Sequence, residues 1–291
     1  MRAGEVAVVG RPNAGKSTLV NRLVGEKVAI VSDKPQTTRK RVLGVARRPG
    51  AEIALVDTPG IHRPEHRMNS AMVRDATDAL STSDVALLVI DASEARGKGE
   101  EFLLKLLERA ARPTLLALNK IDKLAKPSLL PLMAEFSRRF PFRDVVPISA
   151  ATGDGVEALA SALAAALPEG ESAYPQDFLS STPETEWIGE VVREKLLERT
   201  REELPFASAV VVDDVREDDT RNLTVVTAAI YVEKEGQKGI VVGRGGTMIR
   251  EIGRAAREEL EARSGRRYFL ELTVKVRADW REDEGFLSRL I

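Results

Sequence analysis

The chain has 291 residues, about twice the usual size of a single domain, so its length favours two hydrophobic cores. Hydrophobic residues make up 43% and charged residues 31%, which is typical of folded proteins; the lack of cysteine excludes disulfides and thiolate sites and fits a cytoplasmic location. The 44 Lys and Arg against 45 Asp and Glu give a net charge of −1, so the overall charge predicts no partner and any basic surface must be local.

The first half of the chain alternates short apolar runs with amphipathic stretches, which predicts an α/β domain with a mostly parallel sheet and helices on both faces. Strands are predicted at Glu5–Gly10, Val42–Arg47, Glu52–Asp57, Asp84–Asp91, Thr114–Asn119 and Asp144–Ile148. Helices are predicted near residues 16–24, 66–80, 99–111, 129–140 and 155–167. The apolar run Val6–Val9 is too short for a signal peptide, and no run reaches the roughly 18 residues of a membrane span, so we expect no transmembrane segment.

The stretch Pro168–Glu186 holds three prolines and three serines without apolar periodicity, which indicates an interdomain connection. We therefore predict a first domain at residues 1–168, a linker at 169–186 and a second domain at 187–291. The second domain changes the order of elements to α-β-β-α-α-β. Its predicted elements are a helix near Trp187–Glu203, strands near Ala207–Val215 and Leu223–Glu233, a glycine-interrupted helical stretch from Gln237 to about Ser264, and a strand near Tyr268–Arg277.

Residues 10–17, Gly-Arg-Pro-Asn-Ala-Gly-Lys-Ser, match the phosphate-binding pattern G-x-x-x-x-G-K-[ST] between a predicted strand and a predicted helix. Glycines let successive N–H groups face a phosphate, Lys16 adds positive charge, and the helix N-terminus favours an anion. Ser17 is placed to bind Mg²⁺. A plain glycine turn with a surface lysine is the alternative, and the strand and helix on either side disfavour it. The expected nucleotide contacts in this loop are Gly10, Asn13, Ala14, Gly15, Lys16, Ser17 and Thr18.

Asp57-Thr-Pro-Gly60 ends a predicted strand, where an acid beside the phosphate loop can hold Mg²⁺ and Gly60 can offer its N–H to a γ-phosphate. Taken alone, the same string fits a turn equally well. The polar segment Gln36–Arg39 lies where a switch loop closes a threonine over the metal, and we expect Thr38 in that role, with Thr37 as the alternative. The predicted catalytic residues are Lys16, Thr38, Asp57 and Gly60, and the predicted metal ligands are Ser17, Thr38 and Asp57.

Asn119-Lys120-Ile121-Asp122 follows the next apolar strand and predicts which base is bound. Guanine presents two adjacent N–H donors that one carboxylate, Asp122, can accept, whereas adenine has no such pair, so GTP is preferred to ATP. As an isolated string the motif fits a capped turn as well; its position after a phosphate loop favours the base site. Ser149-Ala150 ends the following strand, where backbone N–H groups can meet the guanine oxygen. The expected base contacts are Asn119, Lys120, Asp122, Ser149 and Ala150.

The chain resembles the translation-factor-related GTPases in the order of its motifs: Gly10–Ser17, Gln36–Arg39, Asp57–Gly60, Asn119–Asp122 and Ser149–Ala150. Residues 239–249 (GIVVGRGGTMI) resemble the core of a KH RNA-binding domain, and α-β-β-α-α-β is the type II KH order. One such G domain followed by one KH domain resembles the Era family of bacterial GTPases. The similarity to this family extends to residues 190–196, 203–205, 232–238 and 274–280. The resemblance implies an α/β P-loop G domain followed by an α+β type II KH domain.

This resemblance implies an enzyme that hydrolyses GTP to GDP and phosphate, with GTP or GDP and Mg²⁺ as cofactors. It also implies binding to small-subunit ribosomal RNA near its 3′ end, action in assembly of the small ribosomal subunit, and peripheral contact with the inner membrane. Asn13 matches the asparagine with which related GTPases hold K⁺. Many GTPases carry a water-positioning glutamine where this chain has Ile61, so we expect slow intrinsic turnover. We further expect a monomer.

Apart from the resemblance, G-x-x-G lets a nucleic-acid backbone approach the N-terminus of a helix closely. Residues 238–267 carry eight Lys or Arg against four Glu, a local net charge of +4. A solvated helix face beside a glycine turn is the alternative. The predicted RNA-binding residues are Gly243, Arg244, Gly245 and Gly246.

Two other functions compete with a GTPase switch: a metabolic P-loop phosphotransferase, which has no use for a guanine-binding motif, and an RNA-binding protein with a degenerate G domain, against which all the expected ligands are present. His62 and His66 are interpreted as surface residues rather than metal ligands. Trp187 and Trp280 are interpreted as packing residues.

Overall fold

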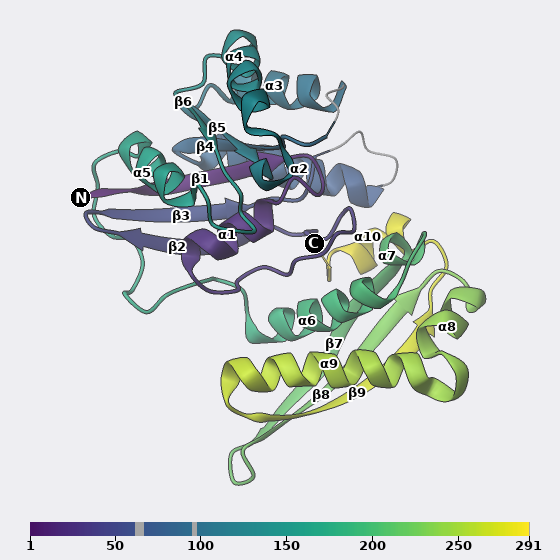
Figure 1. Ribbon diagram of the computed structural model, residues 1–291. Helices are drawn as coiled ribbons and strands as arrows, with labels where there is room; N and C mark the ends of the chain where they lie inside the picture. Colours follow the sequence, from purple (N-terminus) through teal and green to yellow (C-terminus); the bar gives the residue numbers. More distant parts are fainter. Residues whose placement is uncertain (62–66, 95–97, 291) are drawn as a thin grey trace. The chain divides into compact units, whose positions relative to one another are not determined.

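Six strands from the first half of the chain form one sheet in the computed structural model, which describes residues 1–61, 67–94 and 98–290 (Figure 1). The strand order is β2-β3-β1-β4-β5-β6, and neighbouring strands are parallel except β2 and β3. The strands are β1 (Arg2–Gly10), β2 (Val42–Arg48), β3 (Ala51–Asp57), β4 (Val85–Asp91), β5 (Thr114–Asn119) and β6 (Asp144–Pro147). The predicted mostly parallel sheet is confirmed.

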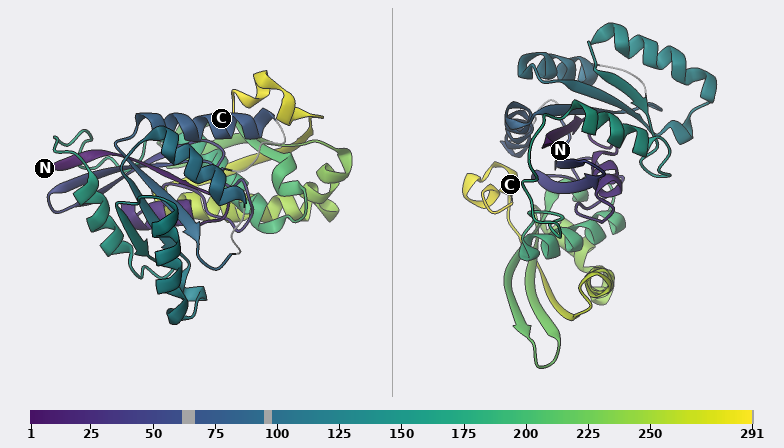
Figure 2. Two further views of the ribbon diagram at one scale, coloured as in Figure 1. Left: turned by 90° about the horizontal axis from the view of Figure 1, so that it is seen from above. Right: turned by 90° about the vertical axis from the view of Figure 1, so that its left-hand side faces the viewer.

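Helices cover both faces of this sheet (Figure 2) because successive side chains of a buried strand point to opposite sides. The helices are α1 (Lys16–Val24), α2 (Arg67–Thr82), α3 (Lys98–Ala110), α4 (Leu129–Arg139) and α5 (Val156–Ala166), with short 3-10 turns η1 (Ile121–Lys123) and η2 (Lys126–Ser128). Val6 and Val8 face α1 and α5, whereas Ala7 and Val9 face the cluster that includes α2, α3 and α4. Two apolar layers therefore hold the sheet from both sides.

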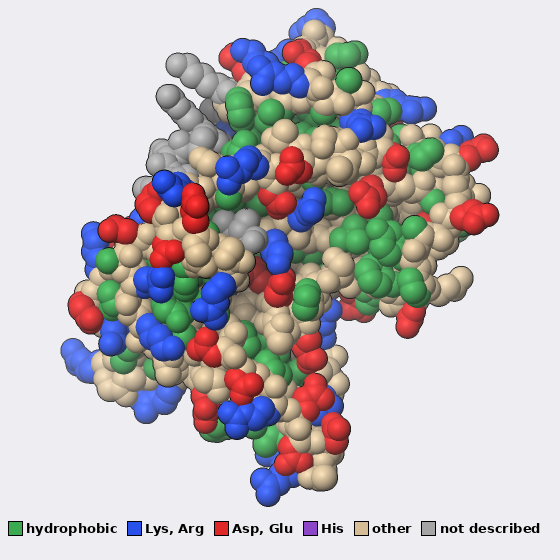
Figure 3. Space-filling model, turned by 180° about the vertical axis from the view of Figure 1, so that it is seen from behind, with side chains coloured by type: hydrophobic (Ala, Val, Ile, Leu, Met, Phe, Trp, Pro, Cys, Tyr) green, Lys and Arg blue, Asp and Glu red, His purple; other side chains and the backbone are tan. Residues whose placement is uncertain are grey.

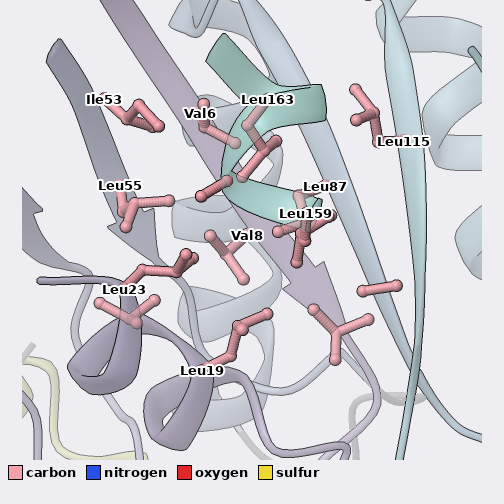
Figure 4. Packing of buried hydrophobic residues seen from close by; sticks show 14 of the residues in the cluster. Val6, Val8, Leu19, Leu23, Ile53, Leu55, Leu87, Leu115, Leu159 and Leu163 are labelled. Atoms are coloured by element: carbon pink, nitrogen blue, oxygen red, sulfur yellow. The ribbon is translucent and has the colours of Figure 1, made fainter. Parts of the chain in front are cut away.

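The layer under α1 and α5 is built from aliphatic side chains that are almost completely removed from solvent. Figure 4 shows Leu19 and Leu23 of α1, Leu159 and Leu163 of α5, and Val6, Val8, Ile53, Leu55, Leu87 and Leu115 of the strands. Each such side chain contributes about 1.5–3 kcal/mol on burial. This packing fixes α1, and with it the loop that precedes α1, against the sheet.

The strands that carry the motifs end at the same edge of the sheet. β1 ends at Gly10, β3 at Asp57 and β5 at Asn119, and these strands run parallel within the sheet. Ligands of open α/β sheets bind beyond the carboxyl ends of the strands. The topology thus gathers three distant sequence motifs at one place.

Residues 169–181, here called the strap, belong to the first of two compact units, Met1–Ser181 and Thr182–Ile291. The sequence predicts an interdomain connection for them, yet they are bonded to the sheet. Leu179 accepts a hydrogen bond from the Val45 N–H at 2.9 Å, and Ser180 forms an antiparallel bridge with Gly44. The strap therefore extends the pairing of β2 for two residues.

Two charged residues of neighbouring strands bind the rest of the strap. Glu52, only 2% exposed, accepts hydrogen bonds from the Ser172 hydroxyl at 2.6 Å and the Ala173 N–H at 2.7 Å. The Arg47 guanidinium, 3.4 Å from Glu52, donates to three strap carbonyls, those of Tyr174, Pro175 and Phe178. Because all of these bonds except that of the Ser172 hydroxyl are to backbone groups of the strap, no local pattern in the linker sequence predicts them.

The second unit has a three-stranded sheet, β7 (Ser208–Asp218), β8 (Leu223–Val232) and β9 (Arg267–Val276), in the order β7-β8-β9. β7 and β8 are antiparallel, while β8 and β9 are parallel. The helices are α6 (Glu184–Arg199), α7 (Leu204–Ala207), α8 (Glu235–Val242), α9 (Thr247–Ser264) and α10 (Glu284–Leu287), with 3-10 turns η3 (Arg244–Gly246) and η4 (Trp280–Glu282). Helices α6 and α9 lie on one face of the sheet (Figures 1 and 2), and the predicted α-β-β-α-α-β order is confirmed.

The first helix of this unit differs from its predicted bounds. It begins at Glu184, inside the predicted linker, and ends at Arg199 rather than Glu203. Thr200 is extended, and the next helical turn starts at Leu204 with a proline at its second position. A proline has no N–H to donate to the preceding turn, so one continuous helix through it is disfavoured.

The two tryptophans are packing residues, as predicted. Trp280 is fully buried, and its Nε1 donates to the Ala207 carbonyl at 3.0 Å. Trp187 is 8% exposed and lies under the Arg263 guanidinium at 4.2 Å. In the described part of the chain, no helix is long and apolar enough to cross a membrane.

Candidate functional site

A pocket of about 560 Å³ opens at the carboxyl edge of the six-stranded sheet. Its wall takes residues from each of the predicted motif regions, including Lys16, Ser17, Thr38, Gly60, Lys120 and Ala151. These residues are far apart in sequence, and only the fold brings them together. The predicted phosphate, switch and base segments therefore share one cavity.

The loop before α1 depends on glycine at two positions. Gly15 has a left-handed φ of 92°, and a Cβ there would lie 2.2 Å from the Asn119 Nδ2. A Cβ on Gly10 would lie 2.3 Å from the Val89 carbonyl oxygen. Larger residues would thus push the loop away from the sheet, which explains why these glycines begin and end the turn.

Lys16 is 5% exposed and lies inside this loop. Its Nζ donates to the carbonyls of Gly10 at 3.3 Å and Arg11 at 3.1 Å. Burial lowers the pKa of Lys16 to about 8, although the charge of Asp57 opposes the shift. The ammonium is therefore held where a bound phosphate would meet it.

The three predicted metal ligands are already in contact with one another. The Ser17 Oγ donates to Asp57 Oδ2 at 2.6 Å and lies 2.8 Å from the Thr38 Oγ1. Thr37 instead donates to the Lys34 carbonyl at 2.6 Å. The geometry therefore favours Thr38 over Thr37 for the metal.

Asp57 is the charged member of this group. Burial raises the pKa of Asp57 to about 6, against the charge of Lys16 and hydrogen bonds from Ser17 and Thr38. Among the described residues its buried Oδ1 has no hydrogen-bond partner. One buried carboxylate oxygen beside two hydroxyls fits Mg²⁺, which takes few protein ligands and completes its shell with phosphates and water. The described ranges hold no group of three His, Cys, Asp or Glu that could bind a metal by itself.

The segment after Asp57 is fixed to the phosphate loop. A Cβ on Gly60 would lie 2.7 Å from the Pro12 backbone, so only glycine allows this approach. The Ile61 N–H donates to the Gly10 carbonyl at 3.0 Å, and the Ile61 side chain is 1% exposed within the core. Ile61 therefore offers no polar group to a water molecule in the pocket. His62 and His66 lie outside the described residues.

On the base side, Asn119 joins two loops. Its Nδ2 donates to the Ala14 carbonyl at 2.7 Å, and its Oδ1 accepts from the Ala150 N–H at 2.9 Å. Asp122 is exposed in η1, between Lys120 and Lys123, which both line the pocket. The Ala150 N–H is thus engaged within the protein, and it is Ala151 that reaches the pocket wall. Ser149 and Ala150 as direct base contacts stay predictions.

Arg22 helps to hold the loop on the base side of the pocket, and the sequence motifs do not include it. It lies on α1, and its Nε and Nη2 donate to the carbonyls of Ala150 at 3.2 Å and Ala151 at 2.5 Å. The helix that starts at the phosphate loop therefore holds the loop on the base side. In the sequence, Arg22 is one of many basic residues on helix surfaces, so no local signal marks it.

The G-x-x-G turn of the second unit separates α8 from α9, as the predicted glycine-interrupted helical stretch indicates. Gly243, Gly245 and Gly246 have φ values of 73°, 59° and 75°, where other residues are strained. A Cβ on Gly243 would also lie 2.8 Å from the Met248 N. The glycines thus place the backbone of the turn directly before the N-terminus of α9.

A groove of about 370 Å³ runs between α9 and the edge strand β9. Arg250, Arg254 and Arg257 supply its charge, while Leu270 and Leu272 are part of its apolar lining. Such a run of arginines is not found everywhere on the surface, since Lys and Arg are mixed with Asp and Glu on the face shown in Figure 3. The sequence predicts the turn and the basic residues but not the β9 side of the groove.

Both units match known families. Residues 5–120 match the family described as 50S ribosome-binding GTPase, and residues 203–281 match the KH domain. GTPase Era of Geobacter metallireducens is 45% identical over 289 residues, which covers 99% of this chain and 97% of that protein.

Two solved structures resemble the whole chain. A variant of Era from Aquifex aeolicus bound to GDP·AlF₄⁻ has a TM-score of 0.95 at 40% identity, covering 99% of this chain and 98% of the other. Era in complex with MgGDPNP and nucleotides 1506–1542 of 16S ribosomal RNA has a TM-score of 0.96 at 40% identity, with the same coverage. The similarity therefore extends over both units.

Proposed function

This chain belongs to the Era family of GTPases, and on that premise we propose that its first unit hydrolyses GTP as a switch while its second unit binds small-subunit ribosomal RNA near the 3′ end, in assembly of the small ribosomal subunit. The observation that carries the first part is that Ser17 and Thr38 line one pocket with Lys16 and contact each other, while the Ser17 hydroxyl also donates to the buried Asp57. A metabolic phosphotransferase would have no use for the guanine-binding segment beside it.

The phosphates of GTP would lie over the N-terminus of α1. Backbone N–H groups of residues 13–18 and the Lys16 ammonium would hold them, because both favour an anion there. Ser17, Thr38 and Asp57 would hold Mg²⁺, which when bound neutralises charge on the phosphate oxygens. Gly60 would donate its N–H to the γ-phosphate. The loop contacts proposed for the nucleotide are Gly10, Asn13, Ala14, Gly15, Lys16, Ser17 and Thr18.

Slow intrinsic turnover follows from the position after Gly60, where the buried Ile61 cannot orient a water molecule. We propose that a K⁺ ion bound at Asn13 supplies positive charge that stabilises the transition state of hydrolysis. Asn13 has a left-handed φ of 61° and donates through Nδ2 to the Asp33 carbonyl at 2.7 Å, so its Oδ1 is the atom that would bind the cation. Asn13 also joins the phosphate loop to the segment before the switch.

GTP turnover should therefore be faster in K⁺ than in Na⁺ at equal ionic strength, by about 10-fold or more. Asn13→Ala should lower the K⁺ rate to the Na⁺ rate while GDP still binds. Phosphate release measured over a titration of each cation checks both statements. Equal rates in the two salts, or a K⁺ response that survives in Asn13→Ala, would remove K⁺ from the mechanism.

RNA would lie in the groove between α9 and β9. The G-x-x-G turn lets its backbone approach the N-terminus of α9, and Arg250, Arg254 and Arg257 follow on successive turns of one helix face. The apolar lining from β9 offers a surface for unstacked bases. Single-stranded RNA fits this combination better than a duplex, whose bases are paired and stacked.

The two activities should be coupled, because Thr38 and Gly60 can contact a γ-phosphate only while GTP is intact. We propose that GTP favours RNA binding. By linkage, RNA must then tighten the binding of GTP by the same factor, typically about 5- to 150-fold. RNA affinity measured with GDP and with a non-hydrolysable GTP analogue at one salt concentration tests this. Identical affinities would mean that the units are only tethered.

Peripheral contact with a membrane and the monomeric state stay predictions of the resemblance and the sequence.

A further inference from the structure

Asp91 is a buried carboxylate that none of the sequence motifs includes. It is the last residue of β4 and lies in register with Asn119, the last residue of β5. Its Oδ2 lies 2.5 Å from the Nζ of Lys120, and the two side chains are 6% and 23% exposed. The ion pair thus joins the end of β4 to the base-binding segment in a place largely shielded from water.

Each oxygen of Asp91 has its own partner. Oδ1 accepts from the Ser93 N–H at 2.9 Å and from the Ser93 hydroxyl at 2.6 Å, which leaves Oδ2 for Lys120. Burial alone would raise the pKa of Asp91, but hydrogen bonds from Lys120 and Ser93 outweigh it and hold the pKa below its ordinary value. The carboxylate is therefore charged at neutral pH, and the pair is a true ion pair.

Lys120 is fixed at both of its ends. Its backbone is left-handed, with a φ of 66° and a ψ of 35°, which few residues other than glycine adopt. Its carbonyl accepts from the Lys123 N–H at 3.0 Å, and the next N–H, of Ile121, donates to Ile148 at 3.2 Å. With the ammonium bound to Asp91, the methylene stem between these ends has little freedom, and Lys120 forms part of the pocket wall.

From this geometry we propose that Asp91 is a positioning residue for the guanine nucleotide: it holds the Lys120 ammonium at the end of β4, so that the lysine stem forms a fixed apolar wall for the base. The inference rests on the proposed nucleotide function of the pocket. Without the carboxylate, the ammonium would leave for water or for the phosphates, and the stem would move with it. The bound base would lose one of its walls.

The expected signature is faster release of nucleotide. GDP and GTP share the base, so both should dissociate faster in Asp91→Asn, by about 10-fold, while their association rates change little. The turnover at saturating GTP should stay unchanged, because the carboxylate of Asp91 is bonded to Ser93 and Lys120, neither of which is proposed to bind the phosphates or the metal. Asparagine keeps the size of the side chain and an acceptor for Ser93, so it removes mainly the charge.

A double-mutant cycle distinguishes action through Lys120 from a structural role of Asp91. The variants are Asp91→Asn, Lys120→Met, which keeps an apolar stem, and the two combined. Ser93→Ala is the matched control, since it removes the hydroxyl bond to the other oxygen of the same carboxylate and keeps the bond from the Ser93 N–H. Release of a fluorescent GDP, chased with excess GDP, is measured for each. In the Lys120→Met background, Asp91→Asn should add less than about twofold, and Ser93→Ala alone should change release less than about twofold.

Two results would overturn the proposal. One is an unchanged release rate in Asp91→Asn; the other is a full 10-fold effect that persists in Lys120→Met, since Asp91 would then act through the turn at residues 91–94. Thermal unfolding without nucleotide shows whether any variant is misfolded, and Asp91→Ala supplies a second test if Asp91→Asn is. A wild-type chain that binds no GDP would instead contradict the proposed function of the pocket.

Discussion

In the nucleotide pocket, side chains from one segment bond to another segment far away in sequence, whereas in the groove the contacts described for Arg250 and Arg254 are with their own helix and the turn before it. Asn119 joins the loops at Ala14 and Ala150, and Ser17 of α1 contacts Asp57 at the end of β3. In the groove, Arg250 bonds to the Gly245 carbonyl at 2.8 Å, and Arg254 lies 4.0 Å from Glu258 one turn away.

The difference corresponds to what each site would bind. Groups held by many cross-links keep one geometry, as recognition of a single small ligand and phosphoryl transfer require. Exposed arginines on a helix can follow a phosphate backbone whose path varies, and they add affinity without demanding one conformation. Substitutions should therefore act sharply in the first site and gradually in the second.

The largest effect is expected at Asp122. Asp122→Asn removes the acceptor for two guanine donors, so GTP affinity should fall by about 10³-fold and affinity for xanthosine nucleotides should rise, because their 2-oxo group needs a donor. Competition titrations with GTP, ATP and xanthosine triphosphate measure both changes. Asp78→Asn, at an exposed acid of α2, is the control. If wild-type protein bound ATP and GTP equally, the guanine assignment would fail.

A smaller, salt-dependent effect is expected at the G-x-x-G turn, which directly precedes the helix that lines the groove. The double variant Arg244→Asp, Gly245→Asp reverses the charge at the G-x-x-G turn, so RNA affinity should fall by about 10- to 100-fold at moderate salt. GTP turnover without RNA should persist, because the substitutions lie in the other unit. Filter binding to single-stranded RNA at several salt concentrations measures the loss.

Gly245 has a left-handed φ of 59° with open space around it, so the single variant Arg244→Asp separates the charge effect from backbone strain. Arg201→Asp, at an exposed arginine outside the groove, is the matched control. Unchanged RNA affinity in the double variant would contradict the assignment of RNA binding to the G-x-x-G turn.

The smallest effect is expected for a cross-linked group that lies outside both sites. Glu52→Gln should lower the stability of the first unit by about 1–2 kcal/mol, because the strap loses hydrogen bonds to a charged acceptor, and should leave GDP and RNA affinity unchanged. Thermal unfolding beside the two binding assays separates these outcomes. A change in either affinity would show that the strap takes part in binding.

The stabilising effect of Glu52 should also depend on pH. Burial alone would raise the pKa of Glu52, but hydrogen bonds from Ser172 and Ala173 and the charge of Arg47 hold it below its ordinary value of 4.5. A carboxyl whose pKa is lowered on folding stabilises the fold above its unfolded pKa and loses that effect as the pH falls through the folded pKa. The stability difference between wild type and Glu52→Gln should therefore shrink below about pH 4.5.

The sequence could predict the parts of these sites that rest on local backbone demands. The phosphate loop is one such part, because Gly15 adopts the left-handed conformation directly before α1, and the first residue of that helix is Lys16. The local sequence therefore predicts that backbone N–H groups and the Lys16 ammonium lie close together. The apolar runs likewise predict the strands, and parallel pairing then brings Asp57 and Asn119 to one edge. The G-x-x-G turn follows from the same demand for left-handed residues.

Other contributors could not be predicted, because their roles depend on partners far away in sequence. Arg22 holds a loop 128 and 129 residues away, and Asp91 meets Lys120 only because β4 and β5 are neighbours. An arginine on a helix and an aspartate at the end of a strand are both common, so the local sequence does not mark Arg22 or Asp91. The groove could likewise be predicted only in part. The basic residues of α9 mark that helix in the sequence, whereas Leu272 has no feature that distinguishes it from other strand residues.

The strap has a consequence for the end of the sheet that it covers. β2 is the outermost strand on its side, and an exposed edge strand offers unpaired N–H and C=O groups to other chains. Leu179 and Ser180 pair with part of that edge. A fragment that stops at Leu167 would retain every nucleotide motif, yet it would leave β2 open to edge-to-edge self-association.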